Sequence, residues 1–253
     1  MDPCSLNVTR VSRQLEWRTL VELSRDQTAL QEIINLEDTH SKNQALFGLP
    51  SRLIAKVYLF RTIYRGSGYA FANDPEFMHV SKDPKFWDDI GEKFYGKYSG
   101  IDACHQAWKD KVVAGLPIVI PSGREWLIEL GRDRRGELKI PWTVLTNYPN
   151  QGLGADVMML VRISLWKRLR ASGRNIKFIS TVHDDIKFDC HEEDIQFVTD
   201  TCHQVFADLQ DNIYRSWRYN WAVPMLCEVY KGMDMLNMEL CEVSNDTSYL
   251  KSA

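Results

Sequence analysis

The sequence predicts an α+β fold, because apolar residues recur with helical spacing in some segments and alternate with polar residues in others. Residues 43–115 have a mostly helical pattern, whereas residues 176–190 alternate as two short strands joined at a bend. A chain of 253 residues can bury a substantial core, in one or two domains.

The expected elements follow one another along the chain. The apolar positions of residues 14–36, among them Leu20, Leu23 and Ile33, predict a helix. The later elements are a mostly helical segment over 43–115 with breaks near 48–50, 66–68, 83–84 and 96–100, strands within 117–145, a helix over 152–170, a hairpin over 176–190, a helix over 192–213 and a strand near 223–230. The polar residues 243–253 are expected to fray.

The overall charge gives no sign of a nucleic-acid-binding protein. The formal net charge is −3 and the isoelectric point is near 6.1, so no global basic field surrounds the chain. Local basic clusters occur around Lys109, Arg134 and Arg168, and such clusters can equally be solvated faces.

The six cysteines include no Cys-x-x-Cys pair. Cys202-His203 and Cys190-His191 have a spacing that fits no standard zinc site, and a helix over 192–213 would place Cys202 in the core. Reduced thiols are the expectation for a cytoplasmic protein. No apolar run long enough for a membrane span and no signal peptide is found.

The first candidate site is the bend of the predicted hairpin, His183-Asp184-Asp185. Adjacent carboxylates at a strand tip suit a hard divalent cation, and two metals held by a few carboxylates commonly catalyse phosphoryl transfer. An Asp-Asp pair at a hairpin is also common as a solvated turn.

The second candidate site is a helix over residues 52–64, which contain neither Gly nor Pro. Arg52, Lys56, Phe60 and Tyr64 are spaced by four residues and form one ridge. Two cations followed by two aromatic rings could bind a triphosphate and then a sugar and base. The alternative is an ordinary amphipathic helix, in which Leu53, Val57, Phe60 and Ile63 or Tyr64 pack and the cations are solvated.

The third candidate site is the segment 147–156, which is expected to open the helix that follows it. Asn147 and Gln151 could form hydrogen bonds to bases or to the backbone in a shallow groove, or they could act as helix caps.

Taken in order, these segments resemble the family A (DNA polymerase I-like) DNA polymerases. The family's motif A ends in Gln-Leu-Glu-Leu-Arg, its motif C reads His-Asp-Glu, and a further motif reads Asn-x-Pro-x-Gln-Gly-x-x-Ala-Asp. The matching residues here are Gln14-Leu15-Glu16-Trp17-Arg18, the motif B residues Arg52, Ala55, Lys56, Phe60 and Tyr64, the segment from Asn147 to Asp156, and His183-Asp184-Asp185. Val223-Pro224-Met225-Leu226 looks like the family's C-terminal strand.

The resemblance implies a role for each matching position. Asp184 would bind metal with support from Asp185, in a site for two Mg²⁺, and His183 would lie beside the primer terminus. The incoming dNTP would meet Arg52, Lys56, Phe60, Tyr64 and Glu16, the last of which would leave no room for a ribose 2′-hydroxyl. Primer–template DNA would be contacted by Asn147, Gln151 and Arg18.

Several positions depart from the family pattern. The first metal-binding Asp of motif A should fall at Val11, which cannot ligate a cation, and Asp2 is the one carboxylate among residues 1–13. Arg65 stands where the family usually has Gly, and Asp185 replaces Glu. Thr143 replaces an expected Arg.

The resemblance also implies a domain organisation. Residues 1–42 would be a partial palm with a remnant of motif A, residues 43–140 an inserted, mostly helical fingers subdomain, and residues 141–253 a palm with an antiparallel sheet and motif C. The thumb and exonuclease domains of complete family members would be absent. A separate chain could then supply the thumb and the missing Asp.

The expected function is template-directed DNA synthesis by a fragment or split-gene half. The run from Tyr64 to Phe71 looks phage-like, which would place the protein in a bacterial host cytoplasm. Two alternatives stay open: a catalytically inactive DNA-binding or scaffold remnant, and a two-carboxylate metal nuclease. A nuclease would leave the ridge from Arg52 to Tyr64 unexplained.

Overall fold

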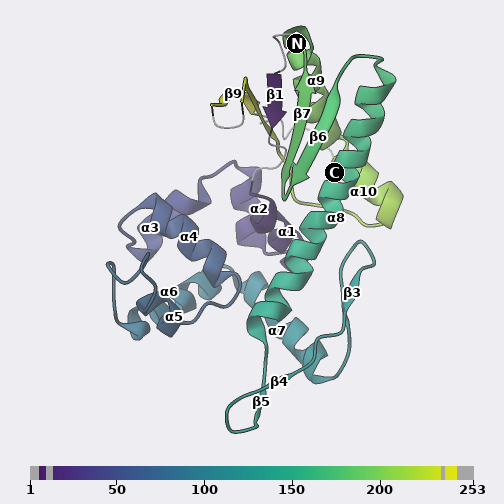
Figure 1. Ribbon diagram of the computed structural model, residues 1–253. Helices are drawn as coiled ribbons and strands as arrows, with labels where there is room; N and C mark the ends of the chain where they lie inside the picture. The colour runs from purple at the N-terminus through teal and green to yellow at the C-terminus, as the bar shows by residue number, and fades with distance from the viewer. Residues whose placement is uncertain (1–5, 10–13, 235–236, 244–253) are drawn as a thin grey trace. The chain divides into compact units, whose positions relative to one another are not determined.

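The computed structural model describes residues 6–9, 14–234 and 237–243 (Figure 1). The chain divides into two compact units. We call Met1–Arg18 together with Gly152–Ala253 the sheet unit, and Thr19–Gln151 the helical unit. Within the described ranges, every helix is too short or too polar to span a membrane.

The sheet unit contains a five-stranded sheet in which every neighbouring pair of strands is antiparallel. Its strands, in spatial order, are β6 (Lys177–Val182), β7 (Asp185–Cys190), β1 (Leu6–Thr9), β8 (Glu228–Gly232) and β9 (Glu239–Val243). The first strand of the chain is therefore the middle strand of the sheet. It pairs with β7, where Val8 lies opposite Phe188, and with β8 on its other edge.

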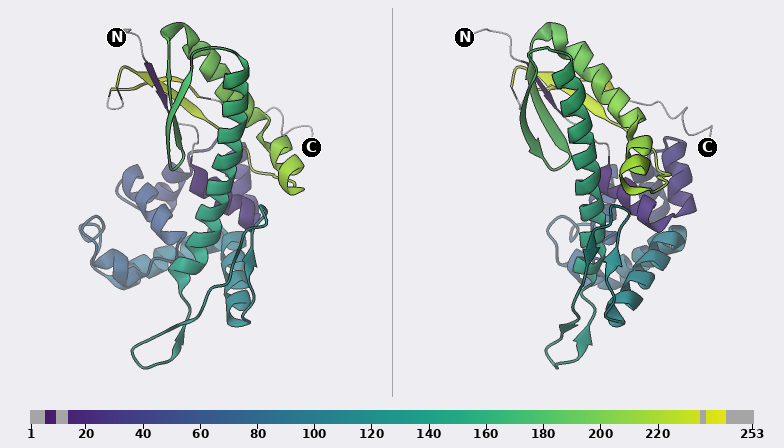
Figure 2. Two further views of the ribbon diagram at one scale, coloured as in Figure 1. Left: turned by 45° about the vertical axis from the view of Figure 1, so that its right-hand side comes forward. Right: turned by 90° about the vertical axis from the view of Figure 1, so that its right-hand side faces the viewer.

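Helices of the sheet unit lie on one side of the β6–β7 hairpin (Figure 2, right). They are the later part of α8 (Trp142–Ala171), the short 3₁₀ helix η1 (Glu192–Asp194), α9 (Ile195–Ala207) and α10 (Leu209–Trp217). Residues of β7 alternate strictly, with Ile186, Phe188 and Cys190 buried. Helix α9 contacts β1 and β8 and buries Cys202, which confirms Cys202 as a core residue.

The helical unit holds most of the helices. Its elements after the start of α1 (Leu15–Ser24) are α2 (Gln27–Ile34), α3 (Thr39–Phe47), α4 (Arg52–Thr62), α5 (Gly68–Ala72), α6 (Pro84–Lys97), α7 (Ser99–Val113), the strand pairs β2 (Ile118–Val119) with β3 (Glu125–Trp126) and β4 (Gly131–Arg132) with β5 (Leu138–Lys139), and the start of α8. The α+β class expected from the sequence is confirmed by these helices and by the antiparallel sheet.

A cluster of aromatic rings forms part of the core of the helical unit. Tyr58 of α4 stacks on Trp87 of α6 with ring centroids 5.6 Å apart, and it lies 4.8 Å from the ring of Phe71 in α5. Phe77 meets Trp87 edge-on at 5.3 Å. Aromatic pairs with such offset or edge-to-face geometry stabilise a core beyond their buried area. The cluster thus fixes the inner face of α4.

Two helices that the pattern predicts as continuous are broken in the structure. The helix expected over 14–36 ends at Ser24, because Arg25 adopts a positive φ of 53° and Asp26 caps a new helix by accepting from Ala29 N at 2.8 Å. The helix expected over 192–213 is divided into η1, α9 and α10, and the break between α9 and α10 lies at Asp208.

Two further expectations are wrong at their boundaries. Helix α8 begins at Trp142 rather than near 152, so residues 142–145 are helical and not strand. Pro149 lies inside this helix, although a proline there removes a hydrogen bond of the helical ladder. The last predicted strand also begins later, at Glu228, and residues 223–226 lie outside any strand.

Candidate functional site

The hairpin bend is a two-residue turn, His183-Asp184, closed by the pair Val182 and Asp185. His183 has a φ of 54°, a left-handed conformation that two-residue hairpin loops require at their first position and that glycine normally supplies. Strain of this kind at a non-glycine residue is often found at functional sites. The turn holds the side chains of three neighbouring polar residues at one end of the hairpin.

The two carboxylates of the bend differ in their surroundings. Asp184 is partly exposed and makes no hydrogen bond or ion pair with any residue that the structure describes. Asp185 is also partly exposed, and its Oδ2 lies 4.0 Å from Nζ of Lys187, two residues along β7. Within the described ranges, no three His, Cys, Asp or Glu side chains gather as a metal site. Val11, the position expected to neighbour this bend, lies outside the described residues.

Helix α4 begins at Arg52 because Ser51 caps it, with its Oγ accepting from Ile54 N at 3.2 Å. The buried face of the helix consists of Ala55, Tyr58, Leu59 and Thr62. Arg52 and Lys56 are exposed and Phe60 is half-buried, so the ridge lies away from the core face. Leu53 is 66 % exposed, so the packing face of the ordinary amphipathic alternative is wrong at that position.

Arg52, the first cation of the ridge, forms a bidentate pair with Asp38. Its Nε donates to Oδ2 at 2.6 Å and its Nη2 donates to Oδ1 at 3.1 Å. Asp38 also caps α3 by accepting from the backbone N–H of His40 and Ser41. The hydrogen bond from Arg52 holds the pKa of the Asp38 carboxyl well below its usual range, so this carboxyl is ionised at neutral pH.

A buried histidine lies beside the same ridge. The ring of His40 is 6.2 Å from the ring of Phe60, measured between centroids. Burial lowers the pKa of His40 to about 4, and the charge of Arg52 acts in the same direction. His40 is therefore neutral at pH 7 and adds no further positive charge to the ridge.

Replacing Asp38 separates its two roles. Asp38→Asn keeps the cap, because Asn caps helices about as well as Asp, and removes the charge that holds Arg52. Since both partners are about half exposed, we expect the free energy of unfolding to change by less than about 1 kcal/mol. Asp38→Ala also removes the cap and should cost about 1 kcal/mol more. Urea unfolding followed by circular dichroism measures the difference between the two variants. Equal losses of unfolding free energy in Asp38→Asn and Asp38→Ala would contradict the separate contributions of the ion pair and the cap.

Tyr64 follows α4 rather than lying in it, and it belongs to a hydrogen-bond chain inside the helical unit. Asn150 Nδ2 donates to the Tyr64 hydroxyl at 3.4 Å, and Thr19 Oγ1 donates to Asn150 Oδ1 at 2.6 Å. Asn150 is fully buried, whereas Asn147 is half-buried and Gln151 is exposed. Sequence reasoning singled out Asn147 and Gln151 and missed Asn150, whose burial no local pattern reveals.

The segment 147–156 lies within α8 instead of opening it, and the boundary between the two units falls inside this segment. In the sheet unit, Glu16 is half-buried in the first turn of α1, and Arg18 is buried with Nη1 donating to the carbonyl of Pro224. Arg18 thus holds the stretch before β8 against α1. Its expected contact with DNA stays a prediction.

Arg65 occupies the position where glycine was expected, and its φ is 59°. Its Nε donates to Nδ1 of His105 at 3.2 Å and its Nη2 donates to Asp102. Its guanidinium carbon lies 3.9 Å from the ring centroid of Tyr95 and 4.9 Å from that of Trp142. Burial lowers the pKa of His105 to about 3, with the Arg65 charge as a further cause, so His105 is neutral and can accept this bond.

Two replacements of Arg65 test the balance between its contacts and its backbone strain. Arg65→Ala loses the ion pair and the ring contacts while keeping the strained φ, and should lower the free energy of unfolding by roughly 2–3 kcal/mol. Arg65→Gly loses the same contacts but relieves about 1 kcal/mol of backbone strain. Urea unfolding should therefore rank wild type above Gly and Gly above Ala. If Arg65→Gly is less stable than Arg65→Ala, the inference that the backbone is strained at residue 65 is wrong.

The candidate residues thus belong to two different units. His183, Asp184, Asp185, Glu16 and Arg18 belong to the sheet unit. The ridge residues, together with Asn147 and Gln151, belong to the helical unit.

Known proteins resemble this chain over most of its length. The sequence model of the family "DNA polymerase family A" matches residues 12–236 of this chain. DNA polymerase I of Caldicellulosiruptor bescii is 23 % identical over 234 residues, which cover 87 % of this chain and 25 % of that protein. The thermostable DNA polymerase I of Thermus aquaticus is 22 % identical over 237 residues, covering 88 % of this chain and 26 % of that protein.

A solved structure has a similar fold. It is the POL domain of Pol1 from M. smegmatis in complex with DNA primer-template and dNTP, with a TM-score of 0.71 and 18 % sequence identity. The match covers 92 % of this chain and 40 % of that one. This chain spans about a quarter of the length of the curated relatives named above. The family model matches most of the residues of this chain. The chain therefore belongs to DNA polymerase family A.

Proposed function

We propose that this chain is the palm and fingers portion of a template-directed DNA polymerase, which transfers a nucleotide from a dNTP to a primer 3′-hydroxyl. The observation that carries the proposal is the pair Asp184-Asp185 at the tip of a hairpin whose neighbour in the sheet is β1. Membership of family A supports it, since the relatives named above are DNA polymerases. The proposed palm comprises residues 1–42 and 141–253, and the proposed fingers comprise residues 43–140.

Asp184 and Asp185 supply the hard oxygen ligands that Mg²⁺ prefers, and the partly exposed, unpaired carboxylate of Asp184 fits this role. Magnesium bound there would neutralise phosphate charge and favour ionisation of the primer hydroxyl. Two adjacent carboxylates are fewer donors than a two-metal site needs. Val11 at the expected third position cannot ligate a cation, so a further carboxylate from outside the described residues would complete the set. His183, at the same turn, would orient the primer end.

The ridge of α4 is proposed to bind the incoming dNTP. Lys56 is exposed and free to reach a triphosphate, and Arg52 can exchange its half-exposed partner Asp38 for phosphate oxygens at little cost. Phe60 would pack on the sugar and base. Tyr64, held by Asn150, would lie at the template side of the new pair, and Glu16 would exclude a ribose 2′-hydroxyl.

Asn147, Gln151 and Arg18 are proposed as DNA contacts, with Asn147 and Gln151 in the minor groove near the primer end. Asn147 and Gln151 are four residues apart on α8 and therefore share one face of the helix. The proposed partners are primer–template DNA, dNTP and a second polypeptide segment that supplies a thumb and the missing carboxylate. The phage-like character of the run from Tyr64 to Phe71 and the cytoplasmic location stay predictions.

Primer extension with Mg²⁺ tests the proposal. The chain by itself should extend a labelled primer very poorly, whereas an assembly with the proposed second polypeptide segment should extend the primer. Binding of DNA without synthesis in both proteins would favour the inactive scaffold. Shortening of the labelled strand would favour the nuclease. Rapid extension by the lone chain would mean that Asp2 or another carboxylate replaces the missing ligand.

A further inference from the structure

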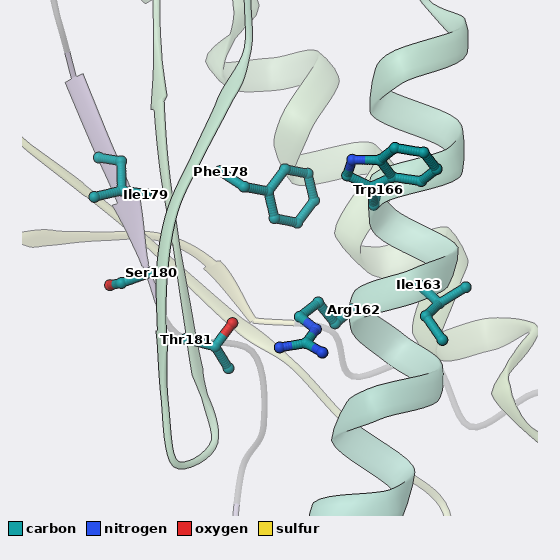
Figure 3. A pocket seen from close by; sticks show the side chains of 7 residues that line it. All are labelled: Arg162, Ile163, Trp166, Phe178, Ile179, Ser180 and Thr181. Atoms are coloured by element: carbon teal, nitrogen blue, oxygen red, sulfur yellow. The ribbon is translucent and has the colours of Figure 1, made fainter.

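The sheet unit contains a groove that the proposed polymerase site does not use. It has a volume of about 440 Å³ and lies between α8 and the edge strand β6 (Figure 3). Its lining comprises Arg162, Ile163 and Trp166 of α8 and Phe178, Ile179, Ser180 and Thr181 of β6.

The groove presents two aromatic rings. Trp166 is 47 % exposed, which is unusual for so large an apolar side chain. Phe178 is half-buried and packs edge-on against Phe188 with ring centroids 4.6 Å apart, so its orientation is fixed by the core. Figure 3 shows the Phe178 ring pointing from the strand toward the helix that carries Trp166. Flat, preorganised rings of this kind can stack with nucleobases at little entropic cost.

The charges around the groove are positive. Arg162 lines it, and its Nη2 donates to Sδ of Met159 at 2.8 Å rather than to a carboxylate. Arg170, two turns further along α8, lies with its guanidinium carbon 5.3 Å from the Trp166 ring centroid. Neither arginine, nor Lys167 between them, has a carboxylate partner in the part of the chain that the structure describes. The ligand that complements this face is therefore anionic.

The edge strand disfavours a protein strand as the occupant. The register between β6 and β7 shifts between Phe178 and Ser180, as in a β-bulge, and β6 begins with Lys177. Bulges and lysines on edge strands hinder the addition of a further strand. The hydroxyls of Ser180 and Thr181 can instead form hydrogen bonds to phosphate or base edges.

We propose that this groove binds single-stranded nucleic acid, with bases stacking on Trp166 and Phe178 and phosphates meeting Arg162 and Arg170. Aromatic rings in a groove, with cations nearby that have no carboxylate partner, are the combination by which proteins hold single strands without reading their sequence. None of the residues that line the groove belongs to the turn His183-Asp184 or to the α4 ridge, and binding in the groove does not depend on polymerase activity.

Anisotropy of a fluorescein-labelled dT12 oligonucleotide at low salt tests the proposal. Trp166→Ala should weaken binding at least about fivefold, the lower end of a lost stacking contact, and Trp166→Phe should retain most of it. Arg162→Gln should reduce the slope of log K against log salt by about 0.7, the change for one phosphate contact on a single strand. Thermal unfolding of each variant establishes that it is folded.

Matched controls come from another exposed face of the same unit. Tyr214 of α10 is 49 % exposed, close to the value for Trp166, and Arg215 is its neighbour. Tyr214→Ala and Arg215→Gln should leave dT12 binding within about twofold of wild type. Failure of the wild type to bind dT12, or equal binding by Trp166→Ala, overturns the proposal.

Two further arms separate a contact in the groove from effects of net charge and of duplex binding. Lys93→Ala removes an exposed lysine of α6 and should leave dT12 binding unchanged, and a loss equal to that of Trp166→Ala in this variant overturns the groove as the site. A blunt 12-base-pair duplex should bind without dependence on Trp166, because its bases are already stacked. Equal dependence of duplex binding on Trp166 overturns the role of stacking.

Discussion

In an assembly of this chain with the second polypeptide segment proposed above, Asp184→Asn should lower the rate of primer extension by roughly 10³-fold. The amide keeps the size of the side chain but removes the charge that a divalent cation requires. Asp184 is partly exposed and has no partner among the described residues, so the replacement leaves no other group unpaired. Single-turnover extension of a labelled primer with saturating dNTP measures the effect on the chemical step.

Strand β7, which follows Asp184, provides two variants for comparison with Asp184→Asn. Asp189→Asn removes a carboxylate from the same strand β7, where it lies 3.7 Å from Lys177, and should change the rate by less than about threefold. Asp185→Glu installs the carboxylate that the resemblance leads one to expect and should retain activity. Extension by Asp184→Asn at the rate of wild type would refute the role of this carboxylate. An equal loss in Asp189→Asn would attribute the effect to folding of the hairpin.

The hairpin and the buried face of its second strand are predictable from local pattern. Ile186 and Phe188 alternate with polar residues, and this period of two can be satisfied only by a strand with one buried face. The position of β1 in the middle of the sheet is not predictable in this way. Its partners are β7 and β8, which lie far along the sequence, so no local signal connects them.

Local backbone geometry explains most of the wrong boundaries. The break after Ser24 depends on the positive φ of Arg25, and an arginine in the sequence gives no indication of such a φ. Asp26, which accepts a hydrogen bond from Ala29 N, is by contrast a recognisable helix cap. The segment 147–156 was expected to open a helix, whereas α8 begins at Trp142 and continues through this segment, Pro149 included. The ridge of α4 was predicted by spacing alone, but the pairing of Arg52 with Asp38 was not, because the two residues belong to different helices.

Lys56→Ala should weaken dNTP binding in the presence of primer–template by roughly 1.5–3 kcal/mol, which corresponds to about a 10- to 150-fold increase in Kd. Lys56 is exposed and is not among the buried residues of α4, so its removal takes nothing from the core. The expected loss is that of a hydrogen bond to a charged group on the triphosphate. Titration of a fluorescent dNTP against protein bound to a dideoxy-terminated primer measures the Kd without turnover.

Two further variants test whether the effect of Lys56 comes from its positive charge alone or from its position on α4. Lys56→Arg keeps the charge and should recover part of the affinity, although the guanidinium presents its donors in a different geometry. Lys93→Ala removes an exposed lysine from α6 of the same unit and should leave the Kd within about twofold of wild type. If Lys56→Ala binds dNTP as tightly as wild type, the ridge of α4 is a solvated surface. If Lys93→Ala weakens binding equally, the effect of Lys56 is one of net charge and not of a contact with the triphosphate.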